Sequence, residues 1–238
     1  MALTVLFAGS VAKHTEAPSE NEDAYRLAPG RIVLSDGASE SFDARSWASL
    51  LVDHMVDQDL SLEAVEACAN AYEALHDPNA LSWSKAAAYE RGSFATLLVA
   101  QDFPESNIIQ VTAIGDSAAV FLDGDEYIAS FPYEHSEQFL ENPILLSTRL
   151  ALNTPSQGSW MSQVWSYKES GRRFLLCMTD ALGAWALAHQ EQGDPSALEI
   201  LRGIRELGEF EALVEAERAA GRMRRDDTTL IVASVQQD

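Results

Sequence analysis

The sequence predicts an α+β domain in which pairs of helices cover antiparallel strands. Apolar runs with strand character follow one another through short links from residue 94 to residue 131, and the link Asp123-Gly124 is a two-residue hairpin signal. Helical patterns gather in pairs before and after these strands instead of alternating with them, unlike a doubly wound parallel sheet. A chain of 238 residues can bury a sizeable core, so we expect a single domain over residues 1–238.

Individual strands are predicted where short runs rich in Val, Ile, Leu or Phe are bounded by Gly, Pro, Asp or Asn. In chain order these runs are 4–7, 31–34, 94–100, 108–114, 118–122, 127–131, 173–178 and 229–234. Helices are predicted where apolar residues recur three and four positions apart, at 44–56, 62–75, 182–189, 195–203 and 210–220. Asp43 or Ser41 is placed to cap the first helix. Residues 131–160 are irregular, and we expect them to form a variable flap outside the core.

The composition excludes some classes of function. With 16 Lys and Arg against 37 Asp and Glu, the net charge is −21. A generic nucleic-acid binder is excluded, because such proteins need cations that neutralise phosphates. No apolar stretch approaches the roughly 20 residues of a membrane span, and the first residues do not resemble a secretory signal. Because Cys68 and Cys177 are also isolated, as is typical of reduced thiols, we expect a cytoplasmic protein.

Acidic residues stand at the ends of the predicted strands. They are Glu22 and Asp23 before the strand at 31–34, Asp36 after it, Asp116 between the strands at 108–114 and 118–122, Asp180 after the strand at 173–178, and Asp226 and Asp227 before the strand at 229–234. Any one of them alone is explained more simply as a turn or cap residue. Together they would converge and repel one another, and no Lys or Arg accompanies each Asp. The sequence therefore favours hard divalent cations with oxygen ligands, Mg²⁺ or Mn²⁺.

In order and spacing these motifs resemble the metal-dependent protein phosphatase (PPM, protein phosphatase 2C-like) family. The stretch Asp36-Gly37-Ala38-Ser39-Glu40-Ser41, together with Phe131-Pro132 and Asn142-Pro143, looks like a compact bacterial branch of it. The resemblance covers about residues 8–235. The matching strings are Asn21-Glu22-Asp23-Ala24, Asp36-Gly37, Gly92-Ser93-Phe94-Ala95-Thr96, Gly115-Asp116-Ser117, Thr179-Asp180 and Asp226-Asp227-Thr228-Thr229. The resemblance implies a four-layer αββα sandwich, in which two antiparallel sheets are flanked by helix pairs.

The resemblance also implies a site and an activity. By resemblance, Asp36 bridges two metal ions, and Gly37 offers its backbone carbonyl. Asp180 and Asp226 bind the first ion, and Glu22 binds the second. Asp23 orients metal-bound water, and Asp116 binds a third, weaker ion that shares Asp180. The implied reaction is hydrolysis of phosphoserine or phosphothreonine by a water that bridges Mn²⁺ or Mg²⁺ ions, with Asp36, Asp23 and Asp180 as catalytic residues. The implied partner is a phosphorylated protein, the substrate of a Ser/Thr kinase. A catalytically weak phospho-signalling adaptor and a small-molecule phosphatase are the alternatives.

Some positions depart from the pattern of the family. Pro18 stands where eukaryotic members have a phosphate-binding Arg, which motivates the adaptor alternative. Lys13 and His14 lie close upstream and are candidates to replace that charge, although a free surface Lys is the simpler interpretation. Ala38 replaces a His that is proposed as a general acid in some members, and Ala181 replaces a usual Gly.

A basic cluster precedes the last acidic motif. It consists of Arg218, Arg222, Arg224 and Arg225, directly before Asp226. The simpler interpretation is a set of cations that ends a helix and balances acidic neighbours. The alternative is a role in binding a substrate anion.

Overall fold

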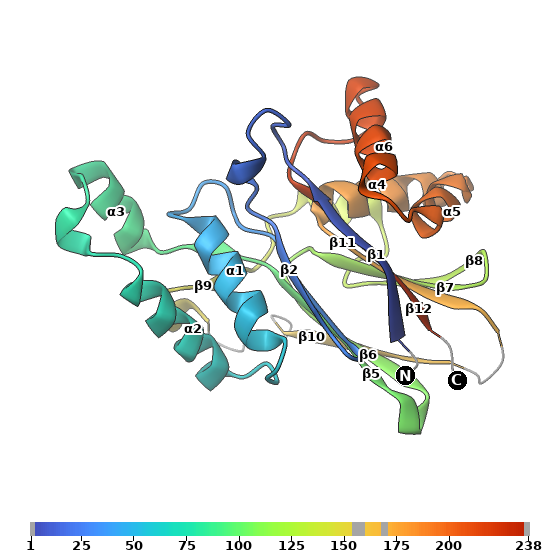
Figure 1. The fold of residues 1–238 in the computed structure, drawn as a ribbon, viewed down its shortest axis with the longest axis horizontal. Helices are drawn as coiled ribbons and strands as arrows, with labels where there is room; N and C mark the ends of the chain where they lie inside the picture. The colour runs from blue at the N-terminus through green and yellow to red at the C-terminus, as the bar shows by residue number, and fades with distance from the viewer. Residues whose placement is uncertain (1–2, 154–159, 168–170, 236–238) are drawn as a thin grey trace.

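The computed structural model describes residues 3–153, 160–167 and 171–235, and its centre is a pair of five-stranded antiparallel sheets. The first sheet has the order β1 (Leu3–Val11), β12 (Thr228–Val235), β11 (Arg173–Met178), β7 (Ala118–Asp123), β8 (Glu126–Phe131). The second has the order β10 (Met161–Ser166), β6 (Ile108–Ile114), β5 (Leu97–Phe103), β3 (Arg31–Ser35), β2 (Ala24–Ala28). A short pair, β4 (Phe94–Ala95) and β9 (Leu146–Ser147), lies beside them. Figure 1 shows the strands at the centre of the molecule with helices to either side.

The central strands are apolar at nearly every position because both faces of each sheet are buried. In β3, Ile32 and Leu34 pack between the two sheets, whereas Val33 packs with the helices. In β11, Cys177 faces the other sheet and Met178 faces the opposite layer of helices. Each fully buried Leu, Ile or Met contributes roughly 1.5–3 kcal/mol of transfer free energy. The alternation along each strand therefore builds three apolar layers from the same short runs.

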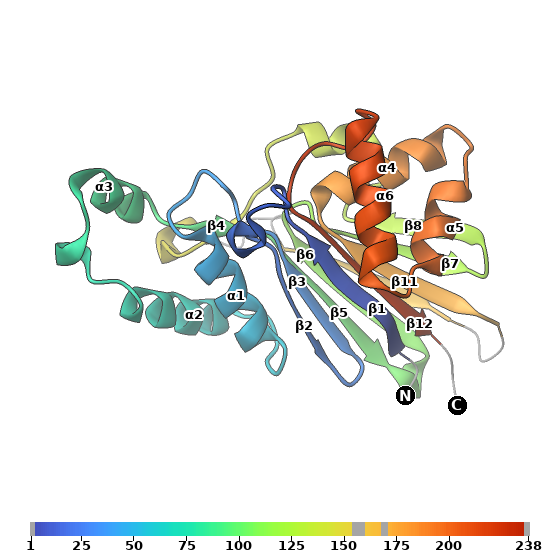
Figure 2. The same ribbon diagram turned by 45° about the horizontal axis from the view of Figure 1, so that its top comes forward.

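Helices form the two outer layers. The second sheet is covered by α1 (Ala44–Met55) and α2 (Leu62–Ala74), and the first by α4 (Asp180–Glu191), α5 (Ser196–Gly203) and α6 (Leu207–Ala219). Figure 2 shows α4, α5 and α6 on one side and α1 and α2 on the other. Asp43 caps α1 by accepting a hydrogen bond from the Ser46 amide at 3.3 Å. The predicted αββα sandwich of two antiparallel sheets is confirmed.

Among the elements that the sequence analysis did not predict, β2, β10 and α3 (Trp83–Arg91) have little apolar signal. The strands β2 and β10 form the two opposite edges of the second sheet. Arg26 and Leu27 of β2 are exposed, and Trp165 is the one buried residue of β10. The helix α3 has no buried residue and extends away from the sheets (Figure 1). These elements are therefore held mainly by backbone hydrogen bonds or local contacts, which leave little periodicity in the sequence.

The described part of residues 131–160 packs against the sandwich. Phe139, in the short 3₁₀ helix Ser136–Leu140, is buried in the layer of α4. Leu146 is buried beside α1, and its carbonyl accepts a hydrogen bond of 2.9 Å from Trp47 Nε1. Residues 154–159 of the expected flap lie outside the described residues. The described stretch is therefore anchored at two points, one on each helical layer.

Two expectations drawn from composition concern membranes and cysteines. Among the described helices, none has the length and the apolar character to cross a bilayer. Cys68 and Cys177 are buried free thiols, as expected, and burial raises the pKa of each to about 12. Neither thiol is therefore ionised near neutral pH.

Candidate metal centre

The ends of the strands bring most of the predicted acidic residues to one edge of the sandwich. Met178, the last residue of β11, pairs with Ala118 at the start of β7 and with Leu230 near the start of β12. In the other sheet the last residue of β3 pairs with the first residue of β2. A pocket of about 620 Å³ opens at this edge; its lining includes Lys13, Asp36, Gly37, Thr96, Asp116, Asp180, Arg224 and Asp226. The predicted ligands Asp36, Gly37, Asp116, Asp180 and Asp226 thus surround one space.

Asp36 is fixed by two hydrogen bonds to Thr96, which lies between β4 and β5. Its amide donates to Thr96 Oγ1 at 2.9 Å, and its carbonyl accepts from the Thr96 amide at 2.8 Å. Gly37 then pairs with Ala95 in an isolated bridge. A Cβ atom at Gly37 would lie 2.9 Å from the carbonyl oxygen of Glu22, which is closer than real Cβ contacts. A glycine is therefore needed for the loop after β3 to approach the chain before β2.

Asp116 is buried, and its position depends on the turn between β6 and β7. Gly115 has φ +92, and a Cβ atom there would lie 2.7 Å from Thr96 Cγ2. Ser117 Oγ is 2.6 Å from Thr96 Oγ1, so the turn is tied to the same residue that holds Asp36. Burial, with the charge of Asp180 acting in the same direction, raises the pKa of Asp116 to about 7.

Asp180 and Asp226 meet at the pocket with Arg224 beside them. Arg224 forms an ion pair with Asp180 Oδ2, and its Nη2 lies 3.4 Å from Asp226 Oδ2. Lys13 Nζ lies 3.4 Å from Asp226 Oδ1. Burial raises the pKa of Asp180 although Arg224 acts against it. Among the described atoms, Asp180 Oδ1 is buried and has no hydrogen-bond partner.

Asp23 is held by threonines at the ends of two strands of the first sheet. Its Oδ2 accepts hydrogen bonds from Thr229 Oγ1 at 2.6 Å and from Thr179 Oγ1 at 3.1 Å. Its Oδ1 is buried and, within the described structure, accepts none. Burial raises the pKa of Asp23 well above its usual range, with the charges of Asp227 and Asp180 acting in the same direction.

The remaining predicted residues lie beside the main pocket. Glu22 and His14 line an adjacent pocket of about 360 Å³, of which Lys13 is also part. Burial raises the pKa of Glu22. Pro18 is exposed and lines a different pocket, so the position of the missing Arg is not part of the main pocket. Of the two candidates to replace that charge, Lys13 lines the main pocket and His14 lines only its neighbour.

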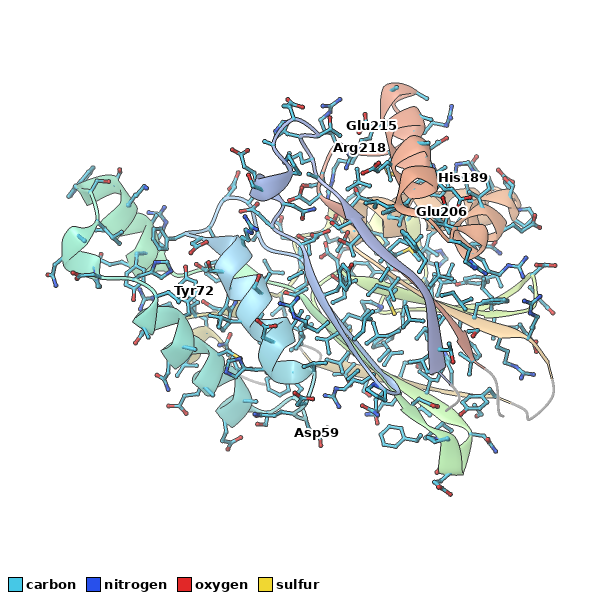
Figure 3. All side chains as sticks on the ribbon, in the orientation of Figure 1. Asp59, Tyr72, His189, Glu206, Glu215 and Arg218 are labelled. Carbon is cyan, nitrogen blue, oxygen red and sulfur yellow. The ribbon has the colours of Figure 1, made fainter. Side chains whose placement is uncertain are left out.

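Asp227 and Arg218 position the site through contacts that the sequence analysis did not predict. Asp227 accepts hydrogen bonds from the Lys13 amide at 2.6 Å and from the Glu22 amide at 2.7 Å, so it joins the end of β1 to the chain before β2. Arg218, beside Glu215 on α6 (Figure 3), is buried and donates to the Ala12 carbonyl at 2.9 Å and to Thr228 Oγ1 at 3.0 Å. The cluster of Asp and Arg residues near position 226 was the sequence feature that could have indicated these contacts, but the sequence does not show which of the residues are buried.

The donor set fits hard divalent cations. Burial raises the pKa of Asp36 well above its usual range, and the charges of Asp23, Asp180 and Asp116 raise it further. Among the described side chains, no three Asp, Glu, His or Cys already stand close enough together to hold a metal ion. The carboxylates therefore surround a shared space without closing on one point. Such mutual repulsion, with an unpartnered carboxylate oxygen, is relieved by a cation with oxygen ligands such as Mn²⁺ or Mg²⁺.

Comparisons with known proteins identify the fold. No protein-family model and no curated protein matches the sequence. Solved structures match over essentially the whole chain. The serine/threonine phosphatase PstP/Ppp of Mycobacterium tuberculosis has a TM-score of 0.65 at 16% identity and covers 100% of both chains. The photosystem II phosphatase PBCP has a TM-score of 0.62 at 15% identity, covering 98% of this chain and 99% of its own.

A third structure carries metal. The catalytic domain of the serine/threonine protein phosphatase PstP, in complex with two manganese ions, has a TM-score of 0.63 at 18% identity and covers 99% of both chains. At these identities the likeness concerns the backbone arrangement and not the individual side chains. The chain therefore has the fold of the metal-dependent, protein phosphatase 2C-like family.

Proposed function

We propose that this protein is a metal-dependent phosphatase that hydrolyses phosphoserine and phosphothreonine esters of proteins. The observation that carries the proposal is the set of buried and partly buried, mutually repelling carboxylates around one pocket, with Lys13 and Arg224 beside them. A purely structural cluster would be neutralised by cations from the chain, whereas Asp180 Oδ1 and Asp23 Oδ1 have no partner in the described structure. The phosphatases that share the fold support the same conclusion.

The proposal gives each acidic residue a role. Asp36, the Gly37 carbonyl, Glu22, Asp180 and Asp226 would hold two Mn²⁺ or Mg²⁺ ions, and Asp116 would hold a third together with Asp180. Such ions lower the pKa of water and stabilise charge on the phosphoryl group. Asp23 is oriented by hydrogen bonds from Thr179 and Thr229, and its other oxygen, Oδ1, would accept a hydrogen bond from the attacking water. Lys13 would attract the phosphate dianion to an otherwise acidic protein.

The test is hydrolysis of a phosphothreonine peptide and of an aryl phosphate, each with Mn²⁺, Mg²⁺ or a chelator. We expect turnover only with metal, and a loss of at least about 100-fold in the Asp36→Asn variant, because a carboxamide cannot balance two cations. Asp102→Asn is the matched control: Asp102 is buried at the far end of β5 and accepts a hydrogen bond of 2.9 Å from Tyr167 Oη. Equal turnover in wild type and Asp36→Asn would contradict the site.

The same assay separates the alternatives. Mn²⁺ binding that is lost in Asp36→Asn, without turnover of either substrate, would favour the phospho-signalling adaptor; the exposed position of Pro18 outside the main pocket is the observation in its favour. A clear preference for the aryl phosphate over phosphopeptides would favour a small-molecule phosphatase. A preference for phosphopeptides would indicate that the cellular partner is a protein phosphorylated by a Ser/Thr kinase, and the proposal places this reaction in the cytoplasm.

A further inference from the structure

Arg224 lies among the carboxylates of the metal centre. Of the described residues that line the main pocket, Lys13 and Arg224 are the cationic ones. Arg224 pairs with Asp180 Oδ2 and lies 3.4 Å from Asp226 Oδ2. It therefore contacts both carboxylates to which the family resemblance assigns the first metal ion.

The contact of Arg224 differs from those of the neighbouring arginines. Arg218 is buried and donates to backbone carbonyls, and Arg222 pairs with both carboxylate oxygens of Glu217 at 2.7 Å. The Arg224 side chain is 53% exposed, much like that of Arg222 at 56%, but a single nitrogen of Arg224 contacts two carboxylates that line the main pocket. A guanidinium that faces solvent on one side can leave Asp180 at low cost only when another cation takes its place, because the guanidinium is then hydrated while the largely buried carboxylate stays paired.

A divalent cation would compete with this guanidinium for the same oxygens. The ion carries twice the charge of Arg224 and would repel it at a separation of a few ångströms. Once displaced, the side chain stays tethered two residues before Asp226, beside the pocket. A free guanidinium has the planar fork of donors that matches two oxygens of a phosphate group.

We propose that Arg224 is a substrate-binding residue that exchanges one anion for another. Without metal it occupies Asp180 and Asp226, and metal binding releases it to bind the phosphate group of the substrate. This inference rests on the proposed function and extends it. Metal binding and phosphate binding are then coupled through one side chain. Arg224 stays paired with Asp180 and Asp226 until metal ions occupy the site, and only then can it bind the phosphate group.

The experiment compares Arg224→Gln with Arg225→Gln. Arg225 is the adjacent residue; it is exposed and is not among the described residues that line the pocket, so its loss changes the net charge equally. Calorimetry measures the affinity for Mn²⁺, and then the affinity of the Mn²⁺-loaded protein for inorganic phosphate. We expect Arg224→Gln to bind Mn²⁺ about fivefold more tightly and phosphate about tenfold more weakly than wild type. Arg225→Gln should match wild type in both.

A second variant, Arg224→Lys, is a more conservative change. It separates the effect of the positive charge from that of the planar guanidinium. Arg224→Lys keeps a cation beside Asp180 but lacks the planar fork, so we expect Mn²⁺ affinity near wild type and phosphate affinity between wild type and Arg224→Gln. The inference is overturned if Arg224→Gln binds Mn²⁺ no more tightly than Arg225→Gln, or if the two bind phosphate equally.

Failure of the proposed function gives a different result. If wild type binds no Mn²⁺, or if Asp36→Asn binds it equally, the metal centre is wrong and the role of Arg224 is wrong with it. If Mn²⁺ and phosphate affinities shift as expected but no phosphopeptide is hydrolysed, the exchange by Arg224 is supported and the enzyme assignment is contradicted.

Discussion

At the scale of single residues, Thr96 connects the two loops that carry Asp36 and Asp116. Its Oγ1 accepts from the Asp36 amide and lies 2.6 Å from Ser117 Oγ, while its methyl group limits the residue at position 115 to glycine. Gly115 thus combines a positive φ, which costs other residues about 1–2 kcal/mol, with a steric limit. The Gly-Asp motif is explained by both requirements together.

We predict that Gly115→Ala destabilises the protein more than Gly124→Ala. Gly124 also has a positive φ, +64, but a Cβ atom there meets nothing within 4 Å. Gly124→Ala should therefore cost about 1 kcal/mol of unfolding free energy, and Gly115→Ala about 2–4 kcal/mol, because the new methyl group pushes against Thr96. Urea unfolding monitored by circular dichroism measures both. Equal losses of unfolding free energy would mean that the positive φ of the turn alone, and not the contact with Thr96, requires glycine at position 115.

At the scale of elements, residues 132–153 tie the pocket to the helices. Leu145 lines the pocket, and the two anchors of the described stretch, Phe139 and Leu146, flank it in sequence. Phe139 fills the space over Gly183 of α4, where a Cβ atom would lie 2.8 Å from its ring. The wall of the pocket is therefore held in place by packing on both helical layers.

Phe139→Ala should loosen this wall. We expect a loss of about 3 kcal/mol, because the ring is buried and its removal leaves a cavity. The neighbouring Leu140 is 86% exposed, so Leu140→Ala should change stability by less than about 0.5 kcal/mol. Limited proteolysis reports the local effect: cleavage within residues 132–145 should accelerate in Phe139→Ala only. Equal cleavage of both variants would show that Phe139 does not anchor the segment.

Much of the arrangement was predictable from sequence where burial is two-sided. The strand at 173–178 was predicted with its observed bounds because every residue of β11 is buried. The edge strands β2 and β10 were missed because partly exposed strands carry weaker patterns, and the packing of residues 131–153 was missed because it rests on separated anchors such as Phe139. The convergence of Asp36, Asp116, Asp180 and Asp226 followed from strand ends, whereas the side chain of Arg224 in the pocket depends on tertiary structure alone.

At the scale of the whole molecule, acidic repulsion is strongest at the pocket edge. The pKa of Asp23 and of Asp36 lies well above the usual range, and that of Asp116 is about 7. Between an ordinary Asp pKa of about 3.9 and about 7, the folded protein therefore binds more protons than the unfolded chain. The stabilising effect of these protons is complete below that interval and is lost as the pH rises through it.

We predict that the metal-free protein melts at a lower temperature at pH 8 than at pH 5. Carboxylates whose pKa is lowered, such as Asp194 and Glu217, are ionised in both the folded and the unfolded protein over most of the range from pH 5 to pH 8, so they oppose the trend only weakly. Mn²⁺ at pH 8 should restore the melting temperature, because it balances the same charges. Differential scanning calorimetry in the presence of a chelator measures the melting temperatures. The Asp116→Asn variant should show a smaller difference in melting temperature between pH 5 and pH 8 than wild type. A melting temperature that rises with pH in chelator would contradict the prediction.

The place of β12 in the first sheet has a consequence for synthesis. This strand inserts between β1 and β11 (Figure 2). Thr228 at its start pairs with Val11, the last residue of β1. As the chain leaves the ribosome, β1 has no neighbour in its sheet until residues 228–235 emerge, and Asp226 reaches the pocket only at the same moment. A nascent chain therefore exposes an unpaired strand for most of its translation, and the metal site is completed in the same step that closes the sheet.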